Sequence, residues 1–167
     1  IKGGEPLEIE RKFLVDYPDI AVLEEKDCRK VEIRQDYLPT IDNKIRRIRK
    51  SDIDGEKKFY YTEKIRLSDQ VRIEREKEIS EDEYNELVPE IAPEAHPINK
   101  TRYYYYEGDL CFEIDLYPEW PDKAVVEVEL KTETTVVNVP KWLNVIREVT
   151  ADQHYRNEYL AFNGFEW

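Results

Sequence analysis

Acidic and basic residues alternate with apolar ones along several short segments, beginning with LEIERKF at residues 7–13. Glu8, Glu10 and Lys12 occupy every second position, so in a strand all three side chains point to one face. Residues two apart on a strand lie about 6.6 Å from each other, so both carboxylates can reach one hard cation. Mg²⁺ and Mn²⁺ prefer such oxygen ligands, and they complete their shells with water and substrate phosphates. Lys12 adds a compact positive charge that suits a phosphate oxygen.

The same period of two recurs along the chain and predicts eight strands. Turn signals separate several of them, including Asp54-Gly55 and Gly108-Asp109. The expected strands cover residues 7–13, 31–38, 44–50, 57–65, 71–79, 99–108, 110–117 and 124–131.

Each of these strands has one charged face, and both signs occur in quantity. The residues on these faces are Glu8, Glu10 and Lys12, then Glu32, Arg34 and Asp36, then Arg47 and Arg49, then Thr62 and Lys64, then Arg72, Glu74, Glu76 and Glu78, then Lys100 and Arg102, then Glu113 and Asp115, and finally Glu127, Glu129 and Lys131. In an ordinary sandwich or barrel these faces would be in water and the apolar faces would form the core.

Four segments with helical patterns favour the opposite arrangement. We expect helices over 80–91, where Ser80 and Glu83 form a capping-box pattern, over 139–149, over 152–162 with Asp152 as the cap, and in 19–26. Their apolar stripes must pack against something, and the apolar faces of the strands are the natural partner. Helices on the outside of the sheet would turn the charged faces inward.

The predicted fold is therefore α+β: an eight-stranded antiparallel barrel with a charged interior and amphipathic helices packed outside. Such a barrel can hold a cavity. Mixed charges make that interior tolerable, because isolated buried charges lose their hydration. The planar forks of Arg47 and Arg49 match phosphate oxygens, so acids and bases on the walls together fit a metal-chelated phosphate chain.

The composition limits the setting of this chemistry. The 167 residues suit one domain, 1–167, and 38 acidic against 26 basic residues leave a net charge of −12. That charge argues against binding a nucleic-acid duplex or an anionic membrane. Two cysteines without metal-type spacing, no run of about 18 apolar residues and no hydrophobic signal core in residues 1–6 indicate a cytoplasmic protein. The sequence leaves open whether the chain forms a homodimer.

In order along the chain, these segments resemble the CYTH superfamily, or triphosphate tunnel metalloenzymes. EIERK is similar to the E-x-E-x-K signature, and RQDYL, RRIR, YYTEK and RIEREKEI look like the motifs that follow it. NKTRY, FEIDLY, VVEVEL, VPKWL and EVTADQHYRNEYLA continue the order, which is most like that of small bacterial inorganic triphosphatases.

The resemblance implies a tunnel in which a divalent cation, Mg²⁺ or Mn²⁺, assists the hydrolysis of a triphosphate. By position, the metal ligands would be Glu8, Glu10, Glu76, Asp115, Glu127 and Glu129. The phosphate-binding residues would be Lys12, Arg47, Arg49, Lys64, Lys100 and Arg102. Lys12 and Tyr37 would be catalytic, because the tyrosine of the RQDYL segment lies near the signature lysine in related enzymes.

Inorganic tripolyphosphate is the expected substrate. Thiamine or nucleoside triphosphate hydrolysis, class IV adenylyl cyclase activity and a non-catalytic polyphosphate-binding module are the alternatives, although the full acidic set favours an enzyme. One register is ambiguous: Arg46 and Arg47 are adjacent, so a slip of one residue would exchange which of them faces the tunnel.

Overall fold

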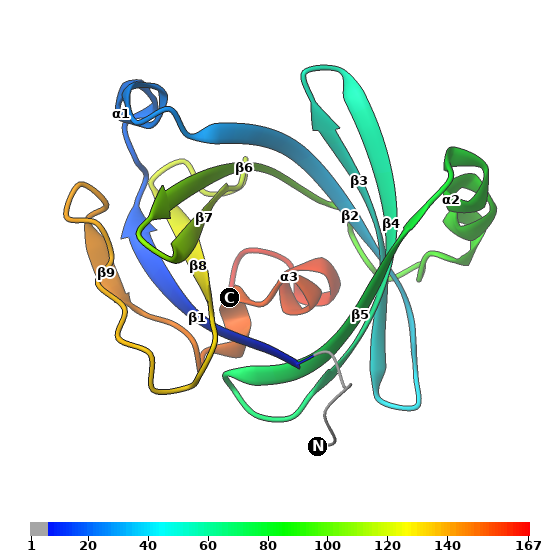
Figure 1. Cartoon of the computed structure of the whole chain (residues 1–167). Helices are drawn as coiled ribbons and strands as arrows, with labels where there is room; N and C mark the ends of the chain where they lie inside the picture. The colour runs from blue at the N-terminus through cyan, green and yellow to red at the C-terminus, as the bar shows by residue number, and fades with distance from the viewer. Residues whose placement is uncertain (1–6) are drawn as a thin grey trace.

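The computed structural model describes residues 7–167 of the chain (Figure 1). Residues 1–6, where we expect no signal core, lie outside the described part. The strands are β1 (Leu7–Asp16), β2 (Arg29–Ile41), β3 (Lys44–Ile53), β4 (Glu56–Arg66), β5 (Val71–Ile79), β6 (Ile98–Glu107), β7 (Leu110–Leu116), β8 (Lys123–Leu130) and β9 (Val145–Glu148). The helices are α1 (Ile20–Glu25), α2 (Glu81–Leu87) and α3 (Asn157–Asn163).

The eight predicted strands form a closed antiparallel barrel, which confirms the expected fold. Their order is β5-β4-β3-β2-β6-β7-β8-β1, and a further pairing of β5 with β1 closes the ring. The tight connections follow the local sequence: Asp54 and Gly55 both have positive φ between β3 and β4, as does Gly108 between β6 and β7. Figure 1 looks through the ring that these strands make.

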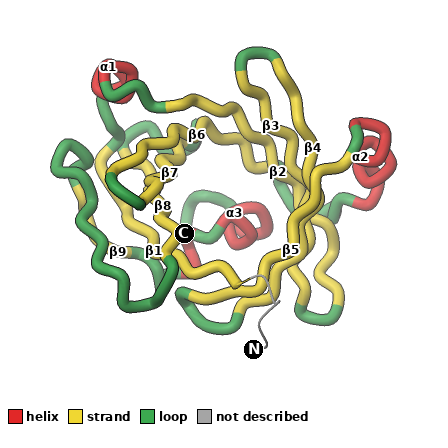
Figure 2. Tube along the Cα trace, viewed as in Figure 1, coloured by secondary structure: helices red, strands yellow, loops and turns green. Residues whose placement is uncertain are grey.

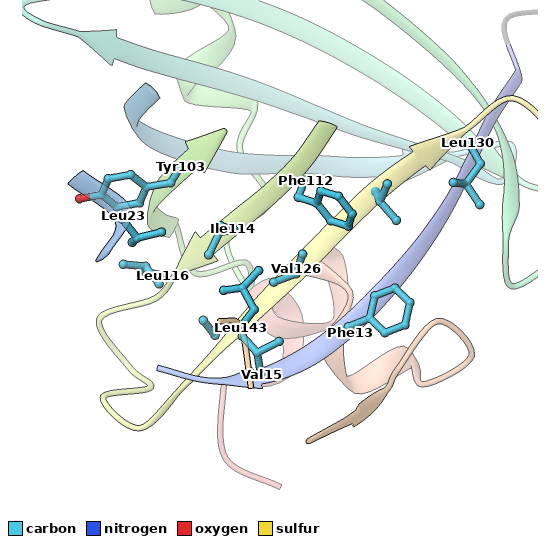
Figure 3. Close-up of a cluster of buried hydrophobic side chains, with 12 residues drawn as sticks. Phe13, Val15, Leu23, Tyr103, Phe112, Ile114, Leu116, Val126, Leu130 and Leu143 are labelled. Atoms are coloured by element: carbon cyan, nitrogen blue, oxygen red, sulfur yellow. The ribbon is translucent and has the colours of Figure 1, made fainter. Parts of the chain in front are cut away.

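The apolar faces of β1, β6, β7 and β8 point outward and form the largest hydrophobic cluster. Phe13, Ile114 and Val126 come from three of these strands and are buried together (Figure 3). Leu23 of α1 and Leu143 of the loop after β8 cover them from outside. The alternation in the sequence thus places the apolar set outside the barrel, which leaves its interior to the charged set.

Helix α2 packs outside β3, β4 and β5. Its capping box is present as predicted: Ser80 accepts a hydrogen bond from the Glu83 amide, and the Glu83 side chain accepts one from the Ser80 amide. Tyr84 and Leu87 then bury against Phe59 and its neighbours. Within the described residues, no helix has the length and apolar character needed to cross a membrane.

The helix predicted over 139–149 is wrong. Only a turn forms at Pro140, where the Leu143 amide donates to the Pro140 carbonyl, and Val145–Glu148 is strand β9. This strand pairs with Phe13, Leu14 and Val15 of β1. The N-terminal end of β1 pairs with β5 but its C-terminal end does not, so an edge of unpaired backbone groups is left for β9 to satisfy.

The C-terminal segment closes one end of the barrel instead of covering its outside. The predicted helix over 152–162 is broken at Arg156 into a short 3-10 helix, Gln153–Tyr155, and α3. Tyr155 and Leu160 pack with the inward-facing Leu14 and Val125. Figures 1 and 2 show α3 within the ring of strands.

The face expected for β2 is also wrong. Gln35 and Tyr37 pair with Arg49 and Arg47 of β3 and belong to the inner face. Arg34 is on the outer face, where its side chain donates to Asp36. A half-buried ion pair on the outer face therefore has the same period of two as the charged faces of the other strands.

We predict that Leu160→Ala lowers the free energy of unfolding by about 2–5 kcal/mol, because it leaves a cavity in the plug that α3 makes. Leu160 is fully buried. Val136→Ala is the matched control: Val136 is 76% exposed, so its change should stay within about 0.5 kcal/mol. Urea unfolding of both variants measures the difference. Equal stabilities would show that α3 does not hold the barrel closed.

Candidate active site

The barrel encloses a cavity of about 190 Å³ whose walls are almost entirely charged. Eight cationic side chains line it, and six carboxylates from the strands and one from α3 lie between them. The lining cations are Lys12, Arg47, Arg49, Lys64, Arg66, Arg72, Arg102 and Arg156, and the carboxylates are Glu10, Glu74, Glu76, Glu113, Glu127, Glu129 and Glu158.

Strands β1 and β8 form the acidic wall. Their register places Glu10 opposite Glu129 and Lys12 opposite Glu127. Burial raises the pKa of Glu129 to about 7, and the nearby charge and hydrogen bond of Glu8 add to the shift. Burial alone would raise the pKa of Glu127, but Lys12 and Arg102 outweigh it and hold that pKa well below its usual range. The carboxylate pair of Glu8 and Glu129 thus lies on the same wall as the ionised carboxylate of Glu127.

Strands β3, β4 and β5 form the basic wall. The Arg47 guanidinium lies 3.9 Å from carboxylate oxygens of Glu74 and Glu76, while Arg72 reaches Glu10 at 2.7 Å. Burial lowers the pKa of Lys64 to about 8. Arg46 points outward, where it donates to the Tyr61 hydroxyl, so Arg47 is the arginine that faces the tunnel.

Three of the residues named from the sequence lie behind the wall or deep in it. Asp115 and Lys100 are fully buried and joined at 2.8 Å, and Arg102 donates twice more to Asp115. Burial lowers the pKa of Lys100 to about 7. Tyr37 is buried beside Arg47, and burial raises its pKa to about 12, so its hydroxyl stays protonated. These three groups shape the site without lining the cavity.

The remaining named residues converge on the cavity, with Glu8 at its edge through its hydrogen bond to Glu129. Lys12 is held by the Tyr155 carbonyl at 3.1 Å and by Glu127 at 3.2 Å. Glu76 accepts a hydrogen bond from Thr62.

Sequence reasoning gave no role to several residues that line the cavity. Arg72, Glu74 and Glu113 were on the predicted charged faces, so the period of two had already marked them. Arg156, Asn157 and Glu158 carried no such signal, because only the folding of the C-terminal segment into the barrel end brings them there.

Glu158 is the anionic group at the closed end of the cavity. Its carboxylate accepts hydrogen bonds from Lys64 at 3.1 Å and from Arg66 at 3.3 Å. Burial alone would raise the pKa of Glu158, but these two cations outweigh it and hold the pKa far below its usual range.

The acidic wall has the chemistry of a site for a hard cation. Its donors are all carboxylate oxygens. Burial, with the like charge of Glu8 added to it, raises the pKa of Glu129, and a cation would relieve both effects. Within residues 7–167 no three acidic, histidine or cysteine side chains already surround a common point, since Glu10 and Glu127 are engaged by Arg72 and Lys12.

Comparison with known proteins shows the family of the chain. Residues 6–148 match the CYTH domain family, so the chain is a CYTH protein. It is similar to the solved structure of the inorganic triphosphatase NE1496, with 31% identity, a TM-score of 0.57 and coverage of 93% of this chain and 95% of that one.

Two more distant structures share the fold. PH1819 from Pyrococcus horikoshii is 23% identical with a TM-score of 0.56, covering 76% of this chain and 80% of that chain. HpAC1 from Hippeastrum, described with a dominant triphosphatase activity, is 17% identical with a TM-score of 0.54, covering 75% and 80%. No protein of curated function matches the chain.

We predict that Glu158→Gln costs about 3–5 kcal/mol of unfolding free energy at pH 7, because it leaves Lys64 buried without its charged partner. The depressed pKa of Glu158 contributes stability above the unfolded-state pKa of about 4.3, and that contribution is lost as the pH falls below it. The difference between wild type and variant should therefore stay level down to about pH 5 and narrow between pH 5 and pH 3. Urea unfolding across this pH range measures it, with the exposed Glu119→Gln as control. A difference that does not change with pH would contradict the assigned pKa.

Proposed function

We propose that this CYTH protein hydrolyses a phosphoanhydride bond of a triphosphate with the help of a divalent cation, and that inorganic tripolyphosphate is its substrate. The observation that carries the proposal is the charged cavity inside the barrel, with a basic wall on β3–β5 and an acidic wall on β1 and β8. The lining of this inner cavity has no apolar surface for an organic group, which favours the inorganic chain.

The basic residues would bind and orient the phosphate chain. Arg47, Arg49 and Arg102 present planar forks that match phosphate oxygens, and Lys12 and Lys64 add point charges. Because these side chains are largely buried, they would stabilise negative charge that develops on the transferring phosphoryl group more strongly than in bulk solvent. Lys100 and Asp115 would hold Arg102 in place from behind.

Glu8, Glu10, Glu127 and Glu129 would hold the cation, with Glu76 contributing from β5. When bound, Mg²⁺ or Mn²⁺ would supply Lewis-acid activation of the phosphoryl group and of the attacking water. Lys12, held between Glu127 and the Tyr155 carbonyl, would orient that water or donate toward the leaving phosphate. Tyr37 would lie beside Arg47 as a neutral phenol, since its pKa of about 12 makes it a poor base.

The first test is phosphate release from tripolyphosphate by the purified protein, with Mg²⁺, with Mn²⁺ and with chelator. We expect release with either metal, none with chelator, and little release from ATP or thiamine triphosphate. Glu8→Ala combined with Glu10→Ala should lower the rate about 100-fold or more, because the cation loses two ligands. Full metal-dependent turnover in that double variant would refute the assignment of the acidic wall. Tight binding of tripolyphosphate without turnover would instead support a binding module.

Arg47 and Arg46 offer a matched pair on one strand. Arg47→Met should lower kcat/KM for tripolyphosphate by about 10- to 100-fold, because a charge-assisted contact to phosphate is lost. Arg46→Met removes the same charge from the outer face, where its partners are Tyr61 and the Pro39 carbonyl, and should leave kcat/KM within about twofold. Steady-state kinetics of both variants give the comparison. Similar losses in the two would mean that net charge, not the tunnel contact, controls the rate.

A further inference from the structure

Arg49 differs from the other seven cations that line the cavity. Each of those has a carboxylate oxygen within 4.0 Å: Lys12 has Glu127, Arg47 has Glu74 and Glu76, Lys64 and Arg66 share Glu158, Arg72 has Glu10, Arg102 has Asp115, and Arg156 has Asp69. In the described part of the chain, the side-chain hydrogen bonds of Arg49 go instead to the neutral amide of Gln35.

The contact between Gln35 and Arg49 fixes the orientation of the guanidinium. Gln35 is fully buried and lies directly opposite Arg49 in the β2–β3 register. Its Oε1 atom accepts hydrogen bonds from both Nε, at 2.9 Å, and Nη2, at 2.5 Å. One edge of the guanidinium is thereby held, and no hydrogen bond from Nη1 is found within residues 7–167, so that nitrogen is left for a ligand.

Arg49 also lies where a phosphate chain would have to pass. It lines the inner cavity and the adjoining mouth of the tunnel, which it shares with Glu76 and Tyr104. Burial lowers the pKa of Arg49 to about 10, and the like charges of Arg47 and Arg102 add to the effect. A bound anion would therefore stabilise the positive charge of Arg49.

A carboxylate at position 35 would give Arg49 the kind of partner that the other cations have. The amide supplies the same acceptor atom without the charge. It does so at a cost, because the buried Nε2 of Gln35 has no hydrogen-bond partner among the described residues. The uncharged oxygen of Gln35 is thus the atom that holds Arg49, while its Nε2 atom makes no hydrogen bond among the described residues.

We propose that Gln35 is a positioning residue that determines the affinity for phosphate: it orients Arg49 without neutralising it, so that Arg49 keeps its full charge for the polyphosphate chain. This inference rests on the proposed function, since it takes the anion in the cavity to be a phosphate chain. If Gln35 only filled space beneath β3, the affinity for phosphate would not depend on the charge at position 35.

Gln35→Glu tests the charge alone, because the two side chains have the same shape. Calorimetric titration with tripolyphosphate in the presence of chelator measures binding without turnover or metal. We expect the dissociation constant to rise about tenfold or more, because a carboxylate would now compete with phosphate for Arg49. The melting temperature should stay level or rise, since the variant completes an ion pair. Asn99→Asp, which adds the same charge on the exposed face of β6, should leave binding nearly unchanged.

A double-variant cycle tests whether Gln35 acts through Arg49. Gln35→Met and Arg49→Met should each weaken binding, and the double variant should be no weaker than Arg49→Met alone. Additive losses, or a Gln35→Glu protein that binds tripolyphosphate as tightly as wild type, would overturn the inference. If wild type itself neither binds nor hydrolyses tripolyphosphate, the proposed function fails and the role of Gln35 fails with it, whereas unchanged binding by Gln35→Glu would overturn the role of Gln35 alone.

Discussion

The structure depends on the pairing of opposite charges inside a closed barrel. Moving a single ion out of water costs several kcal/mol, so a tunnel lined by one sign would not fold. Here almost every cation that lines the cavity forms an ion pair with a carboxylate on another strand or across the cavity. Lys12 pairs with Glu127, for example, and Arg72 with Glu10. This constraint explains why acids and bases are mixed on the same inward faces and why the apolar faces point outward.

The same pairing would prepare the cavity for the proposed phosphate ligand. A phosphate chain with a hard cation carries both signs and can replace internal ion pairs without leaving either wall uncompensated. The partners differ in how firmly they are held: Arg102 is bound twice by Asp115, whereas Arg47 is 3.9 Å from its glutamates and Arg49 has only an amide. Anion binding is therefore expected first at the centre of the basic wall.

The period of two correctly predicted which strand faces point inward on most strands. It failed on β2, where a local ion pair gives the same alternation of charge. Seven inward faces follow the alternation of charge. On β2 the charged alternation belongs to Arg34 and Asp36 on the outside, while Gln35 and Tyr37 face inward. The functional interior of this strand is neutral, so charge could not reveal it.

The sequence by itself determined the eight strands, the paired carboxylates of the first of them and the family. These features are local: they need only a period of two and a few turn residues. The tertiary structure decided that Val145–Glu148 is a strand, because the free edge of β1 lies beside it, and that Glu158 closes the cavity. Both outcomes depend on backbone and charge partners more than 90 residues away in the chain, which no local pattern encodes.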